Sequence, residues 1–161
     1  MTLDDDTLRA QLSVLDRLID ERPDEVQERP LTPSQTMTRL REAVRRDLEA
    51  LLNTRERCRG WPQAFKEIDD SVVGYGLPDF SVLSLQGQWR NSLSRRVVEA
   101  IRRFEPRLTA VNVQFDERRE TLERVARFRI EALMAADPAP EPVAFNTQID
   151  AVTRLMAVAD R

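Results

Sequence analysis

The stretch Phe104-Glu105-Pro106-Arg107-Leu108 lies where the periodicity of the sequence changes. Apolar residues before it recur at every third or fourth position, which predicts an amphipathic helix over residues 86–104. Apolar and polar residues after it alternate, which predicts a strand with one buried face over residues 108–116. Pro106 marks the boundary because proline stops a helix, and opposite charges flank it. The stretch therefore predicts a helical half joined to a sheet.

Further helices are predicted on the N-terminal side of this joint. Residues 5–21 carry apolar side chains at helical spacing, and the proline-rich residues 22–33 have the composition of an exposed linker. A second helix is expected to start at Pro33 and end near residue 53, since Thr32 and Gln35 stand where a capping box needs them. The glycines around Tyr75 then predict a compact ordered loop.

Residues on the C-terminal side predict a small antiparallel sheet. A charged hairpin loop at residues 116–121 leads to a second alternating run at residues 126–132, and a third run covers residues 143–151. Residues 152–158 fit either more strand or a short helix. A strand at the C-terminal end is expected to lie at a sheet edge, where backbone groups are unpaired.

The predicted fold class is thus α+β, with two to three amphipathic helices packed on an antiparallel sheet of about three strands with an open edge. Residues 1–33 are expected to form an N-terminal helix and linker, and residues 34–161 to form the α+β domain. The N-terminus is acidic, unlike a signal peptide, and no apolar run is long enough to cross a bilayer. These features predict a cytoplasmic location.

The composition lacks the residues on which common enzymes depend. The chain has one cysteine, Cys58, and no histidine, so neither a disulfide within the chain nor a common zinc site is expected. No pair of carboxylates has the arrangement that glycoside hydrolysis needs, and Glu42 and Glu49 fit ion-paired surface residues. We therefore expect no catalytic residue, no cofactor and no metal ligand.

The basic residues are almost all arginine, since Lys66 is the only lysine, and the net charge is -3. Arg95, Arg96, Arg102 and Arg103 fall on one side of the helix predicted before Pro106. The aromatic residues of that helix lie on its apolar stripe, where they cannot stack on bases. A solvated or protein-facing arginine surface is expected here, and no binding of nucleic acid.

Three stretches occur together in a recognisable order: Leu40 to Arg55, Tyr75-Gly76-Leu77-Pro78-Asp79, and Glu105-Pro106-Arg107 before a strand. In these the sequence resembles the baseplate wedge and sheath-initiator proteins of contractile phage tails and their type VI secretion counterparts, the TssE proteins. The stretch from Ser13 to Leu18 resembles the N-terminal segment of the secretion branch. The similarity covers residues 13–156.

This resemblance implies a non-enzymatic subunit of a cytoplasmic baseplate, held at the inner face of the membrane by other subunits. The implied partners are the baseplate proteins TssF, TssG and TssK and the sheath subunits TssB and TssC. Glu105, Pro106 and Arg107 take the role of binding the wedge, and Arg107→Ala is expected to abolish wedge assembly while the monomer stays folded.

The resemblance also implies that the sheath adds a strand to an open edge of the sheet, formed by residues 108–116 or 143–152. Phe145, Thr147 and Ile149 are the predicted contacts in the second of these segments. Family members have been labelled lysozyme-like, so the alternative function is a peptidoglycan-hydrolysing enzyme. Peptidoglycan cleavage lost on substitution of Glu42 or Glu105 would indicate that alternative.

Overall fold

The computed structural model describes residues 13–19, 24, 32–56, 65–78, 88–116, 125–136, 139–150, 153 and 155–160. It confirms the α+β class, with a four-stranded antiparallel open sheet in place of about three strands. The strands follow one another in the order β1-β2-β3-β4. They are β1 (Leu108–Phe115), β2 (Val125–Met134), β3 (Glu141–Asp150) and β4 (Met156–Asp160).

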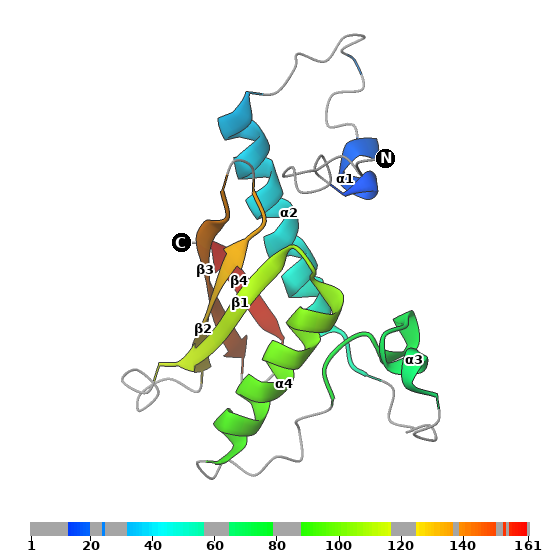
Figure 1. The fold of residues 1–161 in the computed structure, drawn as a ribbon. Coiled ribbons are helices and arrows are strands. Elements are labelled where there is room, and N and C mark those ends of the chain that lie inside the picture. The colour runs from blue at the N-terminus through cyan, green and yellow to red at the C-terminus, as the bar shows by residue number, and fades with distance from the viewer. Residues whose placement is uncertain are drawn as a thin grey trace.

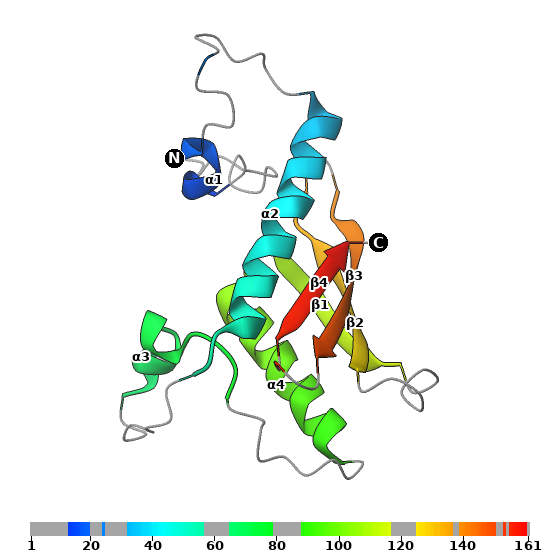
Figure 2. The same ribbon diagram turned by 180° about the vertical axis from the view of Figure 1, so that it is seen from behind.

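Two long helices cover one face of this sheet, α2 (Pro33–Asn53) and α4 (Gln88–Phe104) (Figure 1 and Figure 2). The α2 start confirms the predicted capping box: Thr32 Oγ1 accepts from Gln35 N–H at 3.3 Å, and Gln35 Oε1 accepts from Thr32 N–H at 2.9 Å. The core forms where the apolar stripes of both helices meet the inner side chains of the strands. Its fully buried members include Leu40, Val44, Leu48, Leu52, Val97, Ile101, Ile130 and Phe145.

Three short helical segments complete the described elements: α1 (Val14–Leu18), α3 (Lys66–Asp69) and the 3-10 turn η2 (Val72–Gly74). The helix predicted for residues 5–21 is not continuous: α1 begins after its N-cap Ser13 and ends where Ile19 adopts an extended backbone. None of the described helices is long and apolar enough to cross a membrane. The linker and most of the charged hairpin loop lie outside the described residues, and the domain boundary at residue 33 stays a prediction.

The predicted compact loop around Tyr75 is held by the C-terminal end of α2. Leu77 N–H donates to the Thr54 carbonyl and Glu56 N–H donates to the Leu77 carbonyl, both at 2.9 Å. Gly76 passes this point with φ of +118°, and a Cβ there would lie 2.6 Å from the Thr54 carbonyl oxygen. Leu77 is fully buried, so the loop contributes directly to the core.

The sheet has its edges at β1 and β4, which corrects one prediction. β3 pairs with β2 along its whole length and with β4 from Phe145 to Ile149. Residues 145–149 are therefore not an open edge, because β4 pairs with them. The expectation that a C-terminal strand lies at the edge is confirmed by β4.

Helix side chains bond to backbone groups on the outer sides of both edge strands. On β4, the side chains of Asn53 and Arg45 in α2 bond to the backbone of Met156 and Val158. On β1, Ser94 Oγ in α4 donates to the Val113 carbonyl at 3.0 Å. β1 also contains a bulge, where Ala110 has φ of +50°.

Candidate protein-docking site

The predicted Glu105-Pro106-Arg107 site is a tight turn between α4 and β1. Glu105 N–H donates to the Ile101 carbonyl at 2.8 Å and closes the last turn of α4. The Glu105 carbonyl then accepts from Leu108 N–H at 3.1 Å, and the Arg107 carbonyl accepts from Ala135 N–H at 2.8 Å. Both ends of the turn are thus fixed, one by the helix and the other by the chain that leaves β2.

Within this turn, Arg107 lies between two carboxylates. Its Nε and Nη2 donate to the two oxygens of Glu105 at 2.6 Å and 2.5 Å, and Nη2 also donates to Asp47 Oδ2 in α2 at 2.6 Å. The Glu105 residue is only 4% exposed. The pKa of the Arg107 guanidinium is raised above its ordinary value, first by the hydrogen bonds with Glu105 and, against the effect of burial, by those with Asp47.

One nitrogen of this guanidinium has no partner. Arg107 Nη1 is buried and forms no hydrogen bond with any of the described residues. A pocket of about 350 Å³ adjoins the cluster, with apolar walls that include Leu51, Tyr75 and Phe104. The Tyr75 and Phe104 rings pack edge to face, with centroids 5.2 Å apart. The site therefore combines a buried unsatisfied donor with an aromatic wall.

The environment of the site also shifts the pKa of the Tyr75 hydroxyl. Burial raises the pKa of its hydroxyl, and the negative charges of Asp47 and Glu105 raise it further. Tyr75 thus keeps its proton at neutral pH and can donate a hydrogen bond. The Tyr75 ring is partly buried and packs against the core.

The N-terminal segment lies beside the same pocket, which Ser13 helps to line. Asp16 of α1 accepts hydrogen bonds from Arg46 of α2 and from Ser13. Burial alone would raise the pKa of Asp16, but these hydrogen bonds and the charge of Arg46 together lower it. The apolar side chains of α1 are exposed, at 73% for Val14 and 75% for Leu18. Polar contacts therefore attach α1 to the domain.

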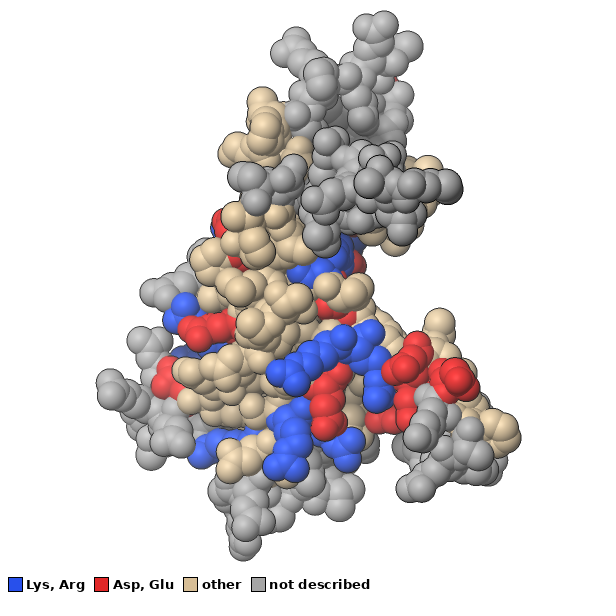
Figure 3. All heavy atoms as spheres, viewed as in Figure 1, with Lys and Arg blue, Asp and Glu red and all other residues tan. Residues whose placement is uncertain are grey.

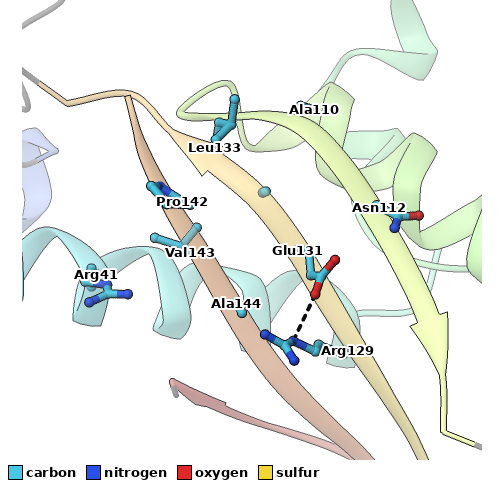
Figure 4. Close-up of a pocket in the computed structure, with 10 residues that line it drawn as sticks. Arg41, Ala110, Asn112, Arg129, Glu131, Leu133, Pro142, Val143 and Ala144 are labelled. Carbon is cyan, nitrogen blue, oxygen red and sulfur yellow. Dashed lines mark ion pairs between the residues drawn. The ribbon is translucent and has the colours of Figure 1, made fainter. Parts of the chain in front are cut away.

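A second hollow, of about 460 Å³, lies on the sheet near the β1 bulge. Figure 4 shows residues of β1, β2 and β3 around it, with Arg41 of α2 beyond them. The dashed line in Figure 4 marks the ion pair of Arg129 and Glu131, with nitrogen and oxygen 3.2 Å apart. The remaining lining is mostly small or apolar, including Ala110, Pro142 and Ala144, and it holds no pair of carboxylates.

The other predicted contact residues lie in β3 and not in the turn. Phe145, Thr147 and Ile149 occupy the inner face of β3, with exposures of 0%, 0% and 7%. The backbone of these three residues pairs with β2 on one side and with β4 on the other. A strand from another protein could pair with them only if β4 detached from β3. Their role in partner binding stays a prediction, and this geometry does not favour it.

Sequence reasoning missed Asp47, which completes the ion cluster. Asp47 is 60 residues from Arg107 in the chain, and no local spacing connects the two. Its carboxylate is 36% exposed, whereas that of Glu105 is 5% exposed. Asp47 thus forms the outer, solvent-facing side of the cluster.

The cluster has little capacity for catalysis. Both oxygens of Glu105 accept hydrogen bonds from Arg107, which leaves this carboxylate poorly placed to transfer a proton to a substrate. Among the described residues, no group of three His, Cys, Asp or Glu side chains is placed to hold a metal ion. A buried, geometrically strict ion pair beside an aromatic pocket is suited to recognising another protein surface.

Comparison with known proteins gives one family. Residues 38–139, more than half of the chain, match the family model described as "Baseplate wedge protein gp25". The match includes most of α2, all of α4, β1 and β2, and with them Asp47, Glu105 and Arg107. No curated protein and no solved structure matches the chain.

Proposed function

The chain belongs to the family of baseplate wedge proteins related to gp25, and on that premise we propose that it is a TssE-type subunit of a type VI secretion baseplate. Family membership supports a structural role in a baseplate. In the proposed role the subunit docks on the wedge proteins TssF, TssG and TssK and initiates the sheath of TssB and TssC. The observation that carries the docking proposal is the buried Glu105–Arg107 pair beside the aromatic pocket, with Asp47 at its exposed side.

The chemistry of the turn defines what a wedge partner must supply. The Asp47 side chain is 36% exposed and that of Arg107 is 22% exposed, so a donor of the partner can bond to Asp47 at the outer side of the cluster. An apolar partner side chain would fill the pocket against Tyr75 and Phe104. Because a buried charge that loses its partner costs about 3–5 kcal/mol, a docked surface must preserve the ion cluster, and this requirement fixes its orientation.

Arg107→Lys tests this docking more sharply than Arg107→Ala. Alanine would leave Glu105 buried and unpaired, so that variant would lose stability as well as binding. Lysine keeps a positive charge beside Glu105 but lacks the planar fork and Nη1. We expect Arg107→Lys to fold and to lose co-purification with TssF, TssG and TssK.

Arg129→Lys is the matched control, because Arg129 also pairs with a nearby carboxylate but lies away from the turn. It should co-purify with the wedge proteins as the parent chain does. An Arg107→Lys variant that assembles normally would show that the turn is not the docking site.

The second part of the proposal assigns sheath addition to the outer edge of β1. Asp116 N–H donates to the Arg127 carbonyl, so the backbone groups of Asp116 point toward β2. Along an antiparallel strand this direction alternates, so the backbone groups of Phe115 and Val113 point away from β2, out of the sheet edge. The hydroxyl of Ser94 occupies one of these groups, the Val113 carbonyl. On β4, by contrast, α2 side chains bond both backbone groups of Met156 and the Val158 carbonyl. β1 is therefore the edge that an incoming strand reaches with the fewest bonds to displace.

A photo-crosslinking amino acid placed on three strands separates the possible edges. Gln114 in β1, Gln148 in β3 and Ala157 in β4 are all exposed. We expect crosslinks to TssB or TssC from position 114 and none from position 148, which lies in an interior strand. Strong crosslinking from position 157 would show that the sheath strand adds to β4. No crosslink from any of the three positions would rule out strand addition.

Incubation of the purified chain with peptidoglycan checks the enzymatic alternative. We expect no release of soluble fragments, because Glu105 is held by Arg107. Cleavage that is lost in Glu105→Gln or Glu42→Gln would replace the scaffold role with a hydrolytic one.

A further inference from the structure

The outward side of α4 carries a concentration of positive charge that the docking turn and the β1 edge do not use. Figure 3 shows arginine side chains gathered over α4, next to acidic side chains of the α3 region. Four arginines and one glutamate lie on this side, all of them exposed, and together they are named the arginine face. They are Arg95, Arg96, Glu99, Arg102 and Arg103.

Two of these four arginines have no ion-pair partner within the described part of the chain, and the other two have only exposed pairs. Arg96 lies 3.7 Å from Glu99 and Arg103 lies 3.0 Å from Asp70, measured between nitrogen and oxygen. These side chains are 42% to 72% exposed, where an ion pair contributes little. Neither Arg95 nor Arg102 forms an ion pair or a hydrogen bond with the described residues.

The arginines of α2 provide an internal comparison. Arg41 lies near Glu141 and Asp160, Arg45 pairs with Glu49, and Arg46 pairs with Asp16. Charges on α2 are therefore balanced locally, whereas α4 has an excess of arginine in a chain whose net charge is -3. This difference shows that the arginine face is a local concentration and does not simply reflect an arginine-rich composition.

The helix dipole explains only half of the arginine face. Arg102 and Arg103 lie in the last turn of α4, where cations interact favourably with the C-terminal carbonyl groups. This effect falls off within one turn. Arg95 and Arg96 lie two turns earlier, beyond the reach of this effect, and only Arg96 has a carboxylate beside it, that of Glu99.

We propose that the arginine face binds an acidic segment of a partner protein. Arg95 and Arg102 are seven residues apart, which places them about 10.5 Å apart along the helix axis. A partner helix laid alongside α4, with carboxylates at the same two-turn interval, can pair with both arginines. Bidentate pairing with the planar guanidinium groups would fix the register of that helix.

Two other kinds of anionic partner fit less well. Nucleic acid binding would use aromatic side chains beside the arginines, but Trp89 and Phe104 of α4 pack against the core. An anionic membrane would need apolar side chains to insert, and the arginine face presents none. Charge alone, spaced along a helix, favours an acidic protein segment.

Fluorescence anisotropy with two labelled peptides tests the proposal on the full chain. One peptide of about 20 residues forms a helix with glutamates at the two-turn interval, and the other has the same composition in scrambled order. We expect the patterned peptide to bind more tightly, with binding that weakens as salt rises. Arg95→Ala/Arg102→Ala should weaken it about fivefold, since two exposed pairs are lost.

The control is Ser34→Glu/Thr38→Glu, which changes the net charge by the same amount at exposed positions of α2. It should leave peptide binding within about twofold of the parent chain. An equal loss in both double variants, no preference for the patterned peptide, or no binding would overturn the proposal. Tighter binding of single-stranded DNA or anionic vesicles, lost in Arg95→Ala/Arg102→Ala, would replace it with that partner.

Discussion

Asn53, the last residue of α2, hydrogen-bonds both backbone groups of Met156, the first residue of β4. Its Nδ2 donates to the Met156 carbonyl and its Oδ1 accepts from Met156 N–H, each at 2.8 Å. A side-chain amide offers one donor and one acceptor, as the backbone of a neighbouring strand does. Asn53 thus takes the place of the strand that β4 lacks on this side.

Asn53→Ala should lower the free energy of unfolding by about 1–3 kcal/mol, because both backbone groups of the buried Met156 lose their partner. Urea unfolding followed by circular dichroism measures the change. Asn146→Ala, on the exposed face of β3, is the control and should have little effect. Equal unfolding midpoints for the two variants would show that Asn53 does not support the edge.

Removal of one member of the Glu105–Arg107 pair should cost more than removal of both. Arg107→Ala leaves a carboxylate that is 5% exposed without its cation, and we expect a loss of about 3–5 kcal/mol. Glu105→Gln/Arg107→Met removes both charges and should recover part of this stability. Denaturant unfolding of both variants gives the comparison. A double variant less stable than Arg107→Ala would contradict the burial argument.

Gly76→Ala should destabilise the domain by about 2 kcal/mol or more, since alanine is strained at φ of +118° and its Cβ would meet the Thr54 carbonyl. Thermal unfolding measures the loss.

Ala110→Gly is the opposite test at the β1 bulge, where φ is +50°. Relief of the left-handed conformation offsets the added chain entropy there, so stability should stay within about 1 kcal/mol of the parent.

Acid should detach α1 from α2. The pKa of Asp16 is lowered in the folded chain, so its ionised form stabilises the attachment above the ordinary carboxyl pKa of about 3.9. This contribution falls as the pH drops through the lower folded-state pKa. NMR chemical shifts of residues 14–18 should lose their helical values over that range. Arg46→Ala should show the loss already at neutral pH, and an unchanged titration in that variant would contradict the assignment.

Local signals predicted the two long helices, α2 and α4, well. The capping box of Thr32 and Gln35 depends on only four consecutive residues, and the structure forms it as expected. The stripe from Leu93 to Ile101 repeats at helical spacing, and all its members are buried. Such features depend only on residues close in the chain, and for that reason sequence reasoning can find them.

The fourth strand and the third member of the ion cluster could not be found in this way. β4 has only five residues, and the outward positions of its pattern are Ala157 and Ala159. Alanine is apolar, so the alternation of polar and apolar residues that reveals a strand is missing. Asp47 meets Arg107 only because α2 and the turn pack together, which is a property of the assembled fold.

The bonds between α2 and β4 also have a consequence for the order of folding. Asn53 and Met156 are 103 residues apart, whereas β1, β2 and β3 pair with strands next to them in the chain. Closing so long a loop costs more entropy than forming a hairpin, so α2 and β4 should come together last. During synthesis β3 is made before β4, and until β4 emerges β3 is a bare edge open to aggregation. Pairing with β4 therefore protects the nascent chain before any baseplate is assembled.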